Sequence, residues 1–224
     1  VWITGPNVDN ITVRNNTLSG NRLAGVIMEG LASMTRQPSE IDILENTISD
    51  AKWGVILNVA SLADVSKVTV NYNNIENNTD FGLNNKASGT VDARFNWWGN
   101  ASGPTHSSNP DGTGDTISDN VDYSPWLGFV VGTTPMTWHV NPTGAPGAIQ
   151  EAIDEASPGD TVIVHEGVYN EAVKVDKTLT LRSSSRPIIQ PDNTTPLYDG
   201  GIRRVAIYIT ADNVVVKGFE IDGT

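Results

Sequence analysis

The chain of 224 residues contains no cysteine, which excludes disulfide bonds, thiolate metal sites and cysteine nucleophiles. Positive charge is also scarce, because 14 Lys and Arg stand against 26 Asp and Glu, for a formal net charge of -12. A surface with this balance repels nucleic acid and anionic lipid, so neither is an expected partner. No apolar run approaches the length of a membrane span. The chain starts at Val1 without Met or a signal peptide, so we interpret it as a processed product or an excerpt of a longer protein.

Long helix-forming runs are nearly absent, whereas Asn, Thr, Gly and Val are abundant. The triplet Asn-x-Ser/Thr marks candidate glycosylation sites at Asn10, Asn15, Asn77, Asn100 and Asn193. An extracellular protein could carry glycans at these positions. The alternative is that a chain rich in Asn and Thr contains such triplets by chance.

An internal repeat indicates the fold. Four segments align without gaps: ITVRNNTLSG from Ile11, IDILENTISD from Ile41, VTVNYNNIEN from Val68 and VDARFNWWGN from Val91. Their shared asparagines are Asn16, Asn46, Asn73 and Asn96. A fifth copy, VVVKGFEIDG from Val214, lacks the asparagine. Each copy has the alternation of a strand, then a bend, then a second short strand, which predicts stacked coils with the extra residues in loops.

Stacked coils would place the four asparagines in a single file at the strand spacing of about 4.8 Å. Each amide could then donate to one neighbour and accept from the other, while satisfying backbone groups that the bend leaves unpaired. Asparagine also tolerates the left-handed backbone of sharp bends, so we expect that conformation here. We therefore interpret the file as structural; the alternative is a row of ligands or catalytic amides.

Two further segments carry a family resemblance. The chain resembles right-handed parallel β-helix proteins of the pectin-lyase-like superfamily in two places. Their closing coils are similar to NWWGNASGP from Asn96 and VDYSPWL from Val121, and their opening coils are similar to the segment from Ala148 to Ser183. More narrowly, the chain resembles NosD-like repeats and surface-layer-type proteins. The resemblance implies an all-β, right-handed parallel β-helix (solenoid) with one short capping α-helix.

The capping helix can also be predicted from the residues. Ala148, Ile149, Ala152, Ile153 and Ala156 form one apolar stripe, and Ser157-Pro158-Gly159 ends it, which predicts a helix over residues 146–156. Such a helix would cover the strand edge of the first coil. Trp97, Trp98 and Trp126 are expected to cover the other end.

The closing signature precedes the opening one, so the two half-solenoids stand in inverted order. We expect the second half of a β-helix over residues 1–127, a linker over 128–136 and the first half over 137–224. Placing Val1 directly after Thr224 separates Val214 from Ile11 by 21 residues, about one coil. We therefore expect residues 207–224 of one copy to stack on residues 1–21 of the next, as a covalent tandem array or a head-to-tail polymer. The alternative is an isolated fragment. The expected interface comprises Val1, Trp2, Ile3, Ile11, Val13, Val214, Val216, Phe219 and Ile221.

Catalytic residues are not evident. The sequence shows no matched acid and base, phosphate loop or nucleophile motif, and gives no reason for His106, His139 and His165 to converge. A calcium site is one candidate, because Asn109, Asp111, Asp115 and Asp119 alternate with small residues. The alternative, ordinary Asp-Gly turns, is favoured. No other cofactor is expected.

The sequence thus predicts a non-enzymatic structural unit of an extracellular filament, sheath or surface layer, whose partners are other copies of itself. A carbohydrate-binding or adhesive solenoid is the second hypothesis, with Trp2, Trp53 and Trp138 as candidate platforms for glycans. A polysaccharide lyase or epimerase is the third.

Overall fold

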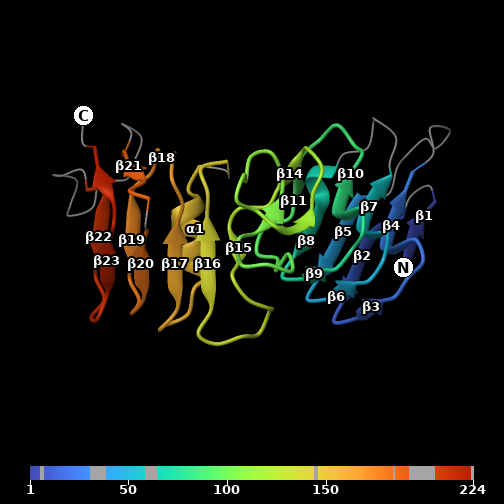
Figure 1. The fold of residues 1–224 in the computed structure, drawn as a ribbon, viewed down its shortest axis with the longest axis horizontal. Helices are drawn as coiled ribbons and strands as arrows, with labels where there is room; N and C mark the ends of the chain where they lie inside the picture. The colour runs from blue at the N-terminus through green and yellow to red at the C-terminus, as the bar shows by residue number, and fades with distance from the viewer. Residues whose placement is uncertain are drawn as a thin grey trace. The chain divides into compact units, whose positions relative to one another are not determined.

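The computed structural model describes residues 1–5, 8–30, 39–58, 65–143, 146–183, 185–191 and 205–222. The chain divides into two compact units, Val1–Val131 and Gly132–Thr224. This division falls inside the predicted linker over residues 128–136. Parallel strands dominate both units, and the described residues contain a single α-helix, α1 (Ala148–Glu155), and one 3₁₀ turn, η1 (Val65–Lys67) (Figure 1).

The first unit winds into coils whose strands form three parallel sheets. The first sheet is β1 (Trp2–Thr4), β4 (Ala24–Glu29), β7 (Trp53–Asn58) and β10 (Phe81–Asn85). The second sheet runs in the order β2 (Asp9–Arg14), β5 (Ser39–Leu44), β8 (Val68–Asn71), β11 (Val91–Asp92) and β14 (Val121–Asp122). The third is β3 (Thr17–Ser19), β6 (Thr47–Ser49) and β9 (Asn74–Glu76). Near the end of the unit lie β12 (Pro104–Thr105), β13 (Gly114–Thr116) and β15 (Trp126–Leu127).

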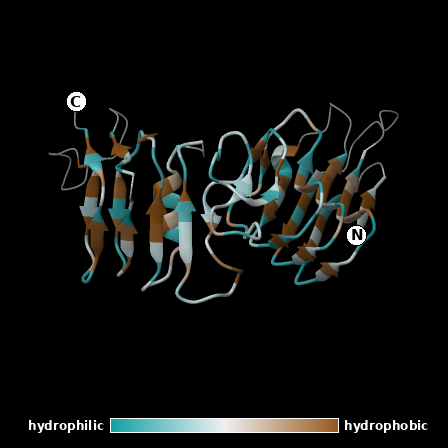
Figure 2. Cartoon of the chain, in the orientation of Figure 1, coloured by the Kyte–Doolittle hydropathy of each residue, from teal (hydrophilic) through white to brown (hydrophobic). Residues whose placement is uncertain are grey.

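The repeat alignment and the strand register agree. Ile11 lies beside Ile41, and Ile41 beside Val68, while two positions later Val13 lies beside Ile43. Side chains two residues apart point to the same face of a strand, so these apolar residues form continuous rows inside the coils. Ile41, Ile43 and Val68 are completely buried. Figure 2 shows the hydrophobic residues mainly along the strands.

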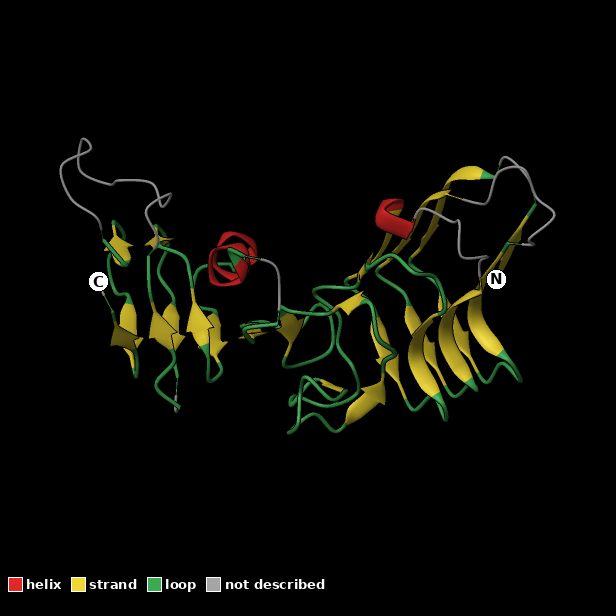
Figure 3. Ribbon diagram, turned by 90° about the horizontal axis from the view of Figure 1, so that it is seen from above, coloured by secondary structure: helices red, strands yellow, loops and turns green. Residues whose placement is uncertain are grey.

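The second unit repeats this three-sided arrangement. Its sheets are β16 (Thr137–Val140), β17 (Thr161–Val164), β20 (Thr180–Arg182) and β23 (Val215–Lys217); β18 (Val168–Tyr169), β21 (Ile188–Ile189) and β24 (Glu220–Ile221); and β19 (Val173–Val175) with β22 (Ile207–Ile209). The pairings within this unit are parallel. Figure 3 shows the strands of each unit side by side, joined by loops. The prediction of an all-β parallel solenoid with one short helix is thus confirmed.

The helix α1 buries the predicted stripe of Ala148, Ile149, Ala152 and Ile153. It is shorter than the predicted range of 146–156 at both ends. Gly147 is left-handed, with φ 95°, and Ala156 is extended, with ψ 145°, so neither can lie within a right-handed helix.

The bends also differ from expectation in one respect. The left-handed residue is the one before each repeated asparagine: Asn15, Glu45, Tyr72 and Phe95 have φ between 55° and 61°. The ladder asparagines themselves do not have positive φ. The repeated asparagines therefore stabilise the bend through the hydrogen bonds of their side-chain amides, and not through their tolerance of a left-handed backbone.

Candidate polar ladders and assembly surfaces

The structure places the four repeated asparagines in one hydrogen-bonded file. The backbone N–H and Nδ2 of Asn16 donate to Oδ1 of Asn46, at 2.9 and 3.0 Å. Asn46 donates in the same way to Asn73, at 2.9 and 3.0 Å, and Asn73 to Asn96, at 2.8 and 3.1 Å. Asn46, Asn73 and Asn96 are buried, whereas Asn16 is exposed. The file has a direction, because each coil donates to the oxygen of the coil after it.

Each amide also binds the backbone around the bend. Nδ2 of Asn46 donates to the carbonyl of Leu44 in its own coil and to that of Val13 in the coil before. Nδ2 of Asn73 makes the equivalent contacts with Asn71 and Ile43. The ladder thus adds side-chain donors to the carbonyl groups at the bend, including those of Leu44 and Asn71, which also accept from the backbone N–H groups of Asn15 and Glu45.

A second, shorter file was not foreseen from the sequence. The N–H of Ala51 donates to Oδ1 of Asn78 at 3.2 Å, and Nδ2 of Asn78 donates to Oδ2 of Asp115 at 2.7 Å. Burial raises the pKa of the Asp115 carboxyl group. The available signal was that Asn78 follows Asn73 by five residues, as Ala51 follows Asn46.

The predicted calcium ligands have separate roles. Nδ2 of Asn109 donates to the carbonyls of Ser102 and Pro104, and Asp115 belongs to the second ladder. The side chain of Asp119 is 91% exposed and contacts His106, while Asp111 is exposed. Across the described ranges, no three or more His, Cys, Asp or Glu residues are arranged to hold a metal ion. The structure does not bring these four residues together as a metal cage, and the loop is held by its own turn contacts.

The first coil provides one set of predicted interface residues. Its strands β1, β2 and β3 are each the last strand at one edge of their sheet in the described part of the chain. Ile3 and Val13 point inward and are buried, Ile11 is partly buried, and Val1 is exposed. Trp2 points outward with 66% of its surface exposed, and its Nε1 donates to Glu29 at 3.1 Å.

The last described coil provides the other set. Strands β22, β23 and β24 are likewise the last described strands at the edges of their sheets. Val214, Val216 and Phe219 are partly buried and Ile221 is exposed. Both coils therefore present strand edges beside incompletely covered apolar residues.

Four of the candidate glycosylation sites, Asn10, Asn15, Asn77 and Asn100, are exposed. Asn10, Asn15 and Asn77 are left-handed corner residues. Oδ1 of Asn100 accepts hydrogen bonds from the backbone N–H and hydroxyl of Ser102. The fifth site, Asn193, lies outside the described residues.

The tryptophans named as glycan platforms differ in accessibility. Trp138 is buried and its Nε1 donates to Asp160 at 3.0 Å, so it cannot offer a flat surface. Trp53 is partly exposed, and the Nζ atoms of Lys52 and Lys86 lie 4.9 and 5.6 Å from its ring centroid. Trp98 and Trp126 are fully buried in the first unit.

Two histidines come together contrary to expectation. Nδ1 of His139 lies 3.0 Å from Nε2 of His165, and their rings stack at 5.2 Å. His139 is the next-to-last residue of β16 and His165 directly follows β17, so the parallel register brings together residues that lie 26 apart in the sequence. Burial, followed by the charges of His165 and Arg182, lowers the pKa of His139 to about 3.

Three side chains fasten α1 to the coil that follows it. The carboxylate of Glu171 accepts hydrogen bonds from the N–H groups of Ile149 and Gln150, at 3.1 and 3.0 Å. Lys177 donates to the carbonyls of Asp154 and Ala156 at the helix end. Burial raises the pKa of Glu171.

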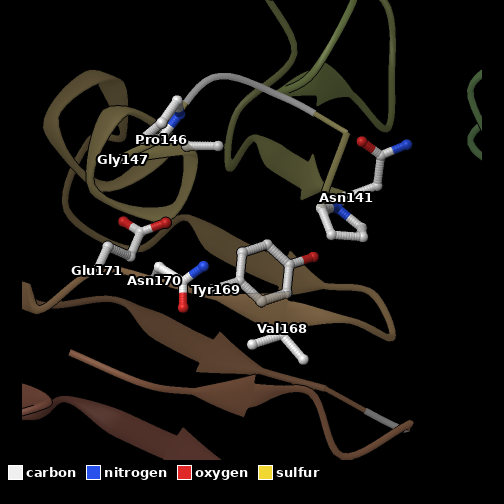
Figure 4. Close-up of a pocket in the computed structure, with 9 residues that line it drawn as sticks. Asn141, Pro146, Gly147, Val168, Tyr169, Asn170 and Glu171 are labelled. Carbon is white, nitrogen blue, oxygen red and sulfur yellow. The ribbon is translucent and has the colours of Figure 1, made fainter. Parts of the chain in front are cut away.

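Between these two caps, the side-chain amide of Gln150 binds strand β19 as a neighbouring strand would. Its Oε1 accepts from the N–H of Lys174 at 2.6 Å, and its Nε2 donates to the carbonyl of Lys174 at 3.3 Å. Beside the cap, a small pocket of about 120 Å³ is lined by Asn141, Tyr169, Asn170 and Glu171, among others (Figure 4).

These coils and ladders define a parallel β-solenoid. The chain is 39% identical over 77 residues to the cell surface glycoprotein of Methanothermus fervidus, and the match covers 34% of this chain and 12% of that protein. The chain therefore spans about an eighth of the relative's length. No protein family model matches the chain, and no solved structure matches it. The resemblance to pectin-lyase-like and NosD-like proteins stays a prediction. No described helix has the length and apolarity needed to cross a membrane.

Proposed function

We propose that the protein is a non-enzymatic structural module of an extracellular surface layer, sheath or filament, and that its copies join by stacking coil on coil. The observation that carries the proposal is a solenoid whose first and last described coils both present strand edges and partly exposed apolar side chains. The similarity to a cell surface glycoprotein supports a location at the cell surface. Stacking would continue the same parallel sheets and apolar rows from one copy to the next.

Two carboxyl groups with raised pKa values support a structural rather than a catalytic role. Asp115 and Glu171 have raised pKa values, as a general acid would, but both are already bound to backbone N–H groups. Asp115 accepts from Asn78, and Glu171 accepts from the first turn of α1. Each carboxyl thus has a role in the fold itself. An assay for unsaturated uronate products tests this part of the proposal, and product formation by the purified protein would overturn it.

Assembly can be tested by light scattering coupled to size exclusion, over a hundredfold range of protein concentration, together with negative-stain electron microscopy. We expect the mass to increase with concentration and elongated particles to form. A Val216→Lys variant is expected to remain monomeric, because it places a charge in the apolar row at the joint. Lys86→Ala, an exposed change in another coil, is the matched control. A wild-type protein that stays monomeric at every concentration would contradict head-to-tail stacking.

A second candidate function, binding of acidic glycans, is favoured by one observation. Trp53 is a partly exposed ring flanked by two ammonium groups in a protein of net charge -12. Such a site could contact a sugar ring and a carboxylate together. Glycan-array binding that is lost in Trp53→Ala and kept in Phe129→Ala, a change of another exposed aromatic residue, would support this candidate; no binding to any glycan would remove it.

A further inference from the structure

We infer the register of the joint between copies: strand β23 of one copy pairs with β2 of a second copy so that Val216 lies beside Val13, and Asn16 is the acceptor at the bend. This inference rests on the proposed function, because it specifies how the stacked copies meet. The partner is a second copy of this chain, whether or not it is covalently continuous with the first.

Left-handed residues fix the alignment. In the first coil, Asn10, inside strand β2, and Asn15, directly after it, are both left-handed, with φ 56°. Glu40 and Glu45 bear the same relation to β5 in the second coil. In the last described coil, Asn213 and Gly218 bracket β23 with the same spacing of five residues and φ of 55° and 90°. Gly218 therefore corresponds to Asn15, and Phe219 corresponds to Asn16.

The backbone hydrogen bonds of both units repeat one pattern at this corner. The residue after the strand donates to the coil that follows, as Asn15 does to the carbonyl of Leu44 and Ser183 does to that of Lys217. Two residues later the donation runs backwards, as from Thr47 to Asn16. At the joint, Gly218 N–H should therefore donate to the carbonyl of Arg14, and Thr17 N–H to that of Phe219.

Asn16 completes the pattern. In the buried rungs, Asn46 donates to the carbonyl of Val13 and Asn73 donates to that of Ile43. The corresponding partner for Nδ2 of Asn16 is the carbonyl of Val216. Oδ1 of Asn16 would accept the backbone N–H of Phe219, as Oδ1 of Asn46 accepts that of Asn16.

Phe219 has no amide side chain, but the first member of a file does not need one. The second ladder shows this, because Ala51 starts it with its backbone N–H alone, 3.2 Å from Oδ1 of Asn78. Phe219 can start the first ladder in the same way. Phe219, in the place of a ladder asparagine, lacks only the side-chain donor of that rung.

The inferred register also matches the faces of the strands. Val216 and Val13 both point inward, since Val216 pairs with Leu181, which is completely buried, and Val13 is itself buried. On the first sheet, β22 would pair with β1, and Ile209, which lies beside the buried Val175, points inward as Ile3 does. A shift of one residue would turn every apolar side chain outward. The register also places Lys217 beside Arg14, whose guanidinium group is already paired with Glu45 at 2.5 Å. Because Lys217 and Arg14 are both positively charged, no ion pair forms between them across the joint, and added salt should not weaken it.

Site-specific cross-linking tests the register, because the chain contains no native cysteine. A Val215→Cys variant is mixed with Thr12→Cys, and separately with Asn10→Cys or Arg14→Cys, and disulfide formation is followed. All four positions are exposed. We expect the pair with Thr12 to form at least about tenfold faster, because a shift of two residues moves the partner about 7 Å along the strand, beyond the reach of a disulfide.

The outcomes separate the two proposals. Faster cross-linking to Asn10→Cys or Arg14→Cys, or assembled particles with no cross-link in any pair, would overturn the register and leave the proposed function intact. Monomers without cross-links would overturn both.

The role of Asn16 has its own test. Asn16→Leu should slow the cross-linking of Val215→Cys to Thr12→Cys at least about tenfold, whereas Asn16→Asp, which keeps an acceptor oxygen, should slow it less. Thermal unfolding of each monomer checks that the first coil remains folded. An unchanged cross-linking rate in Asn16→Leu would show that Asn16 does not take part in docking.

Discussion

Asparagine suits the inside of a ladder because its side chain both donates and accepts. Asn46 and Asn73 use both abilities, since each accepts from the coil before and donates to the coil after. Asp115 can stand at the end of the second file because the last member receives hydrogen bonds from Asn78 and need not donate along it. The position of a residue in the file thus determines which side chains are acceptable there.

The first prediction concerns a buried rung. Asn46→Leu should lower the free energy of unfolding by about 1–3 kcal/mol, because it removes the acceptor of the partly buried Asn16 N–H and the side-chain donor to the buried carbonyl of Val13. Denaturant unfolding measures the loss. Asn16→Leu is the matched control and should cost less, because Asn16 is exposed. Equal and negligible losses would contradict the stabilising role of the ladder.

The second prediction concerns pH. The pKa of His139 is about 3 in the folded protein against an ordinary value of 6.5, so the unfolded chain binds the extra proton first as the pH falls. As the pH falls from 6.5 to 5, the free energy of unfolding should therefore decrease, and His139 contributes at most about 1.4 kcal/mol of this decrease per pH unit. Glu171 and Asp115, with raised pKa values, act in the opposite direction.

The contribution of His139 is isolated by comparing the wild type with His139→Gln across that pH range. The difference in unfolding free energy should shift in favour of the variant as the pH falls. Parallel curves for the two proteins would contradict a buried, neutral His139.

At the scale of elements, α1 takes the place of a strand. In the coils that follow, the third sheet of this unit is formed by β19 and then β22, and α1 lies on the other side of β19. A helix cannot offer backbone hydrogen bonds sideways, because its N–H and carbonyl groups are used along its own axis. The side chain of Gln150 supplies these bonds instead. The helix therefore closes the sheet edge that a strand would leave open for pairing.

The third prediction follows from this arrangement. Glu171→Ala should destabilise the second unit by about 0.5–2 kcal/mol, because it removes the only side-chain cap that the described structure provides for the first turn of α1. Hydrogen exchange should accelerate at the amides of Ile149, Gln150 and Lys174. Lys174→Ala, which removes the exposed ion pair with Asp176, is the control and should change stability by less than about 0.5 kcal/mol. Unchanged exchange at α1 in Glu171→Ala would contradict the capping role.

At the scale of the whole molecule, stability and assembly are linked. A solenoid coil is stabilised by contact with its neighbours, so a coil at a sheet edge gains stability when another coil covers it. The net charge of -12 opposes association through long-range repulsion, which salt screens.

The fourth prediction therefore concerns concentration. If copies stack only when folded, the melting temperature should rise with protein concentration, and more steeply at high salt. Differential scanning calorimetry over a hundredfold concentration range measures this. Val216→Lys should melt at a temperature that does not depend on concentration. A constant melting temperature in the wild type would contradict stacking.

The strands of the first unit could be predicted from the sequence because their information is local. Apolar residues alternate with period two, and a gap-free repeat sets Ile11, Ile41 and Val68 in one register, so the parallel stack and the positions of Asn46 and Asn73 follow from the pattern. The apolar stripe of α1 was equally readable, since a helix needs only neighbours in sequence to define its face.

Tertiary structure alone decided the contacts between residues without a shared pattern. His139 meets His165, Asn78 meets Asp115 and Glu171 caps α1 because loops of irregular length bring different coils into register, and loop lengths do not reveal where a chain returns. The dispersal of Asn109, Asp111, Asp115 and Asp119 has the same cause. A repeating pattern specifies how equivalent residues stack, whereas contacts between non-equivalent residues depend on the three-dimensional path of the chain.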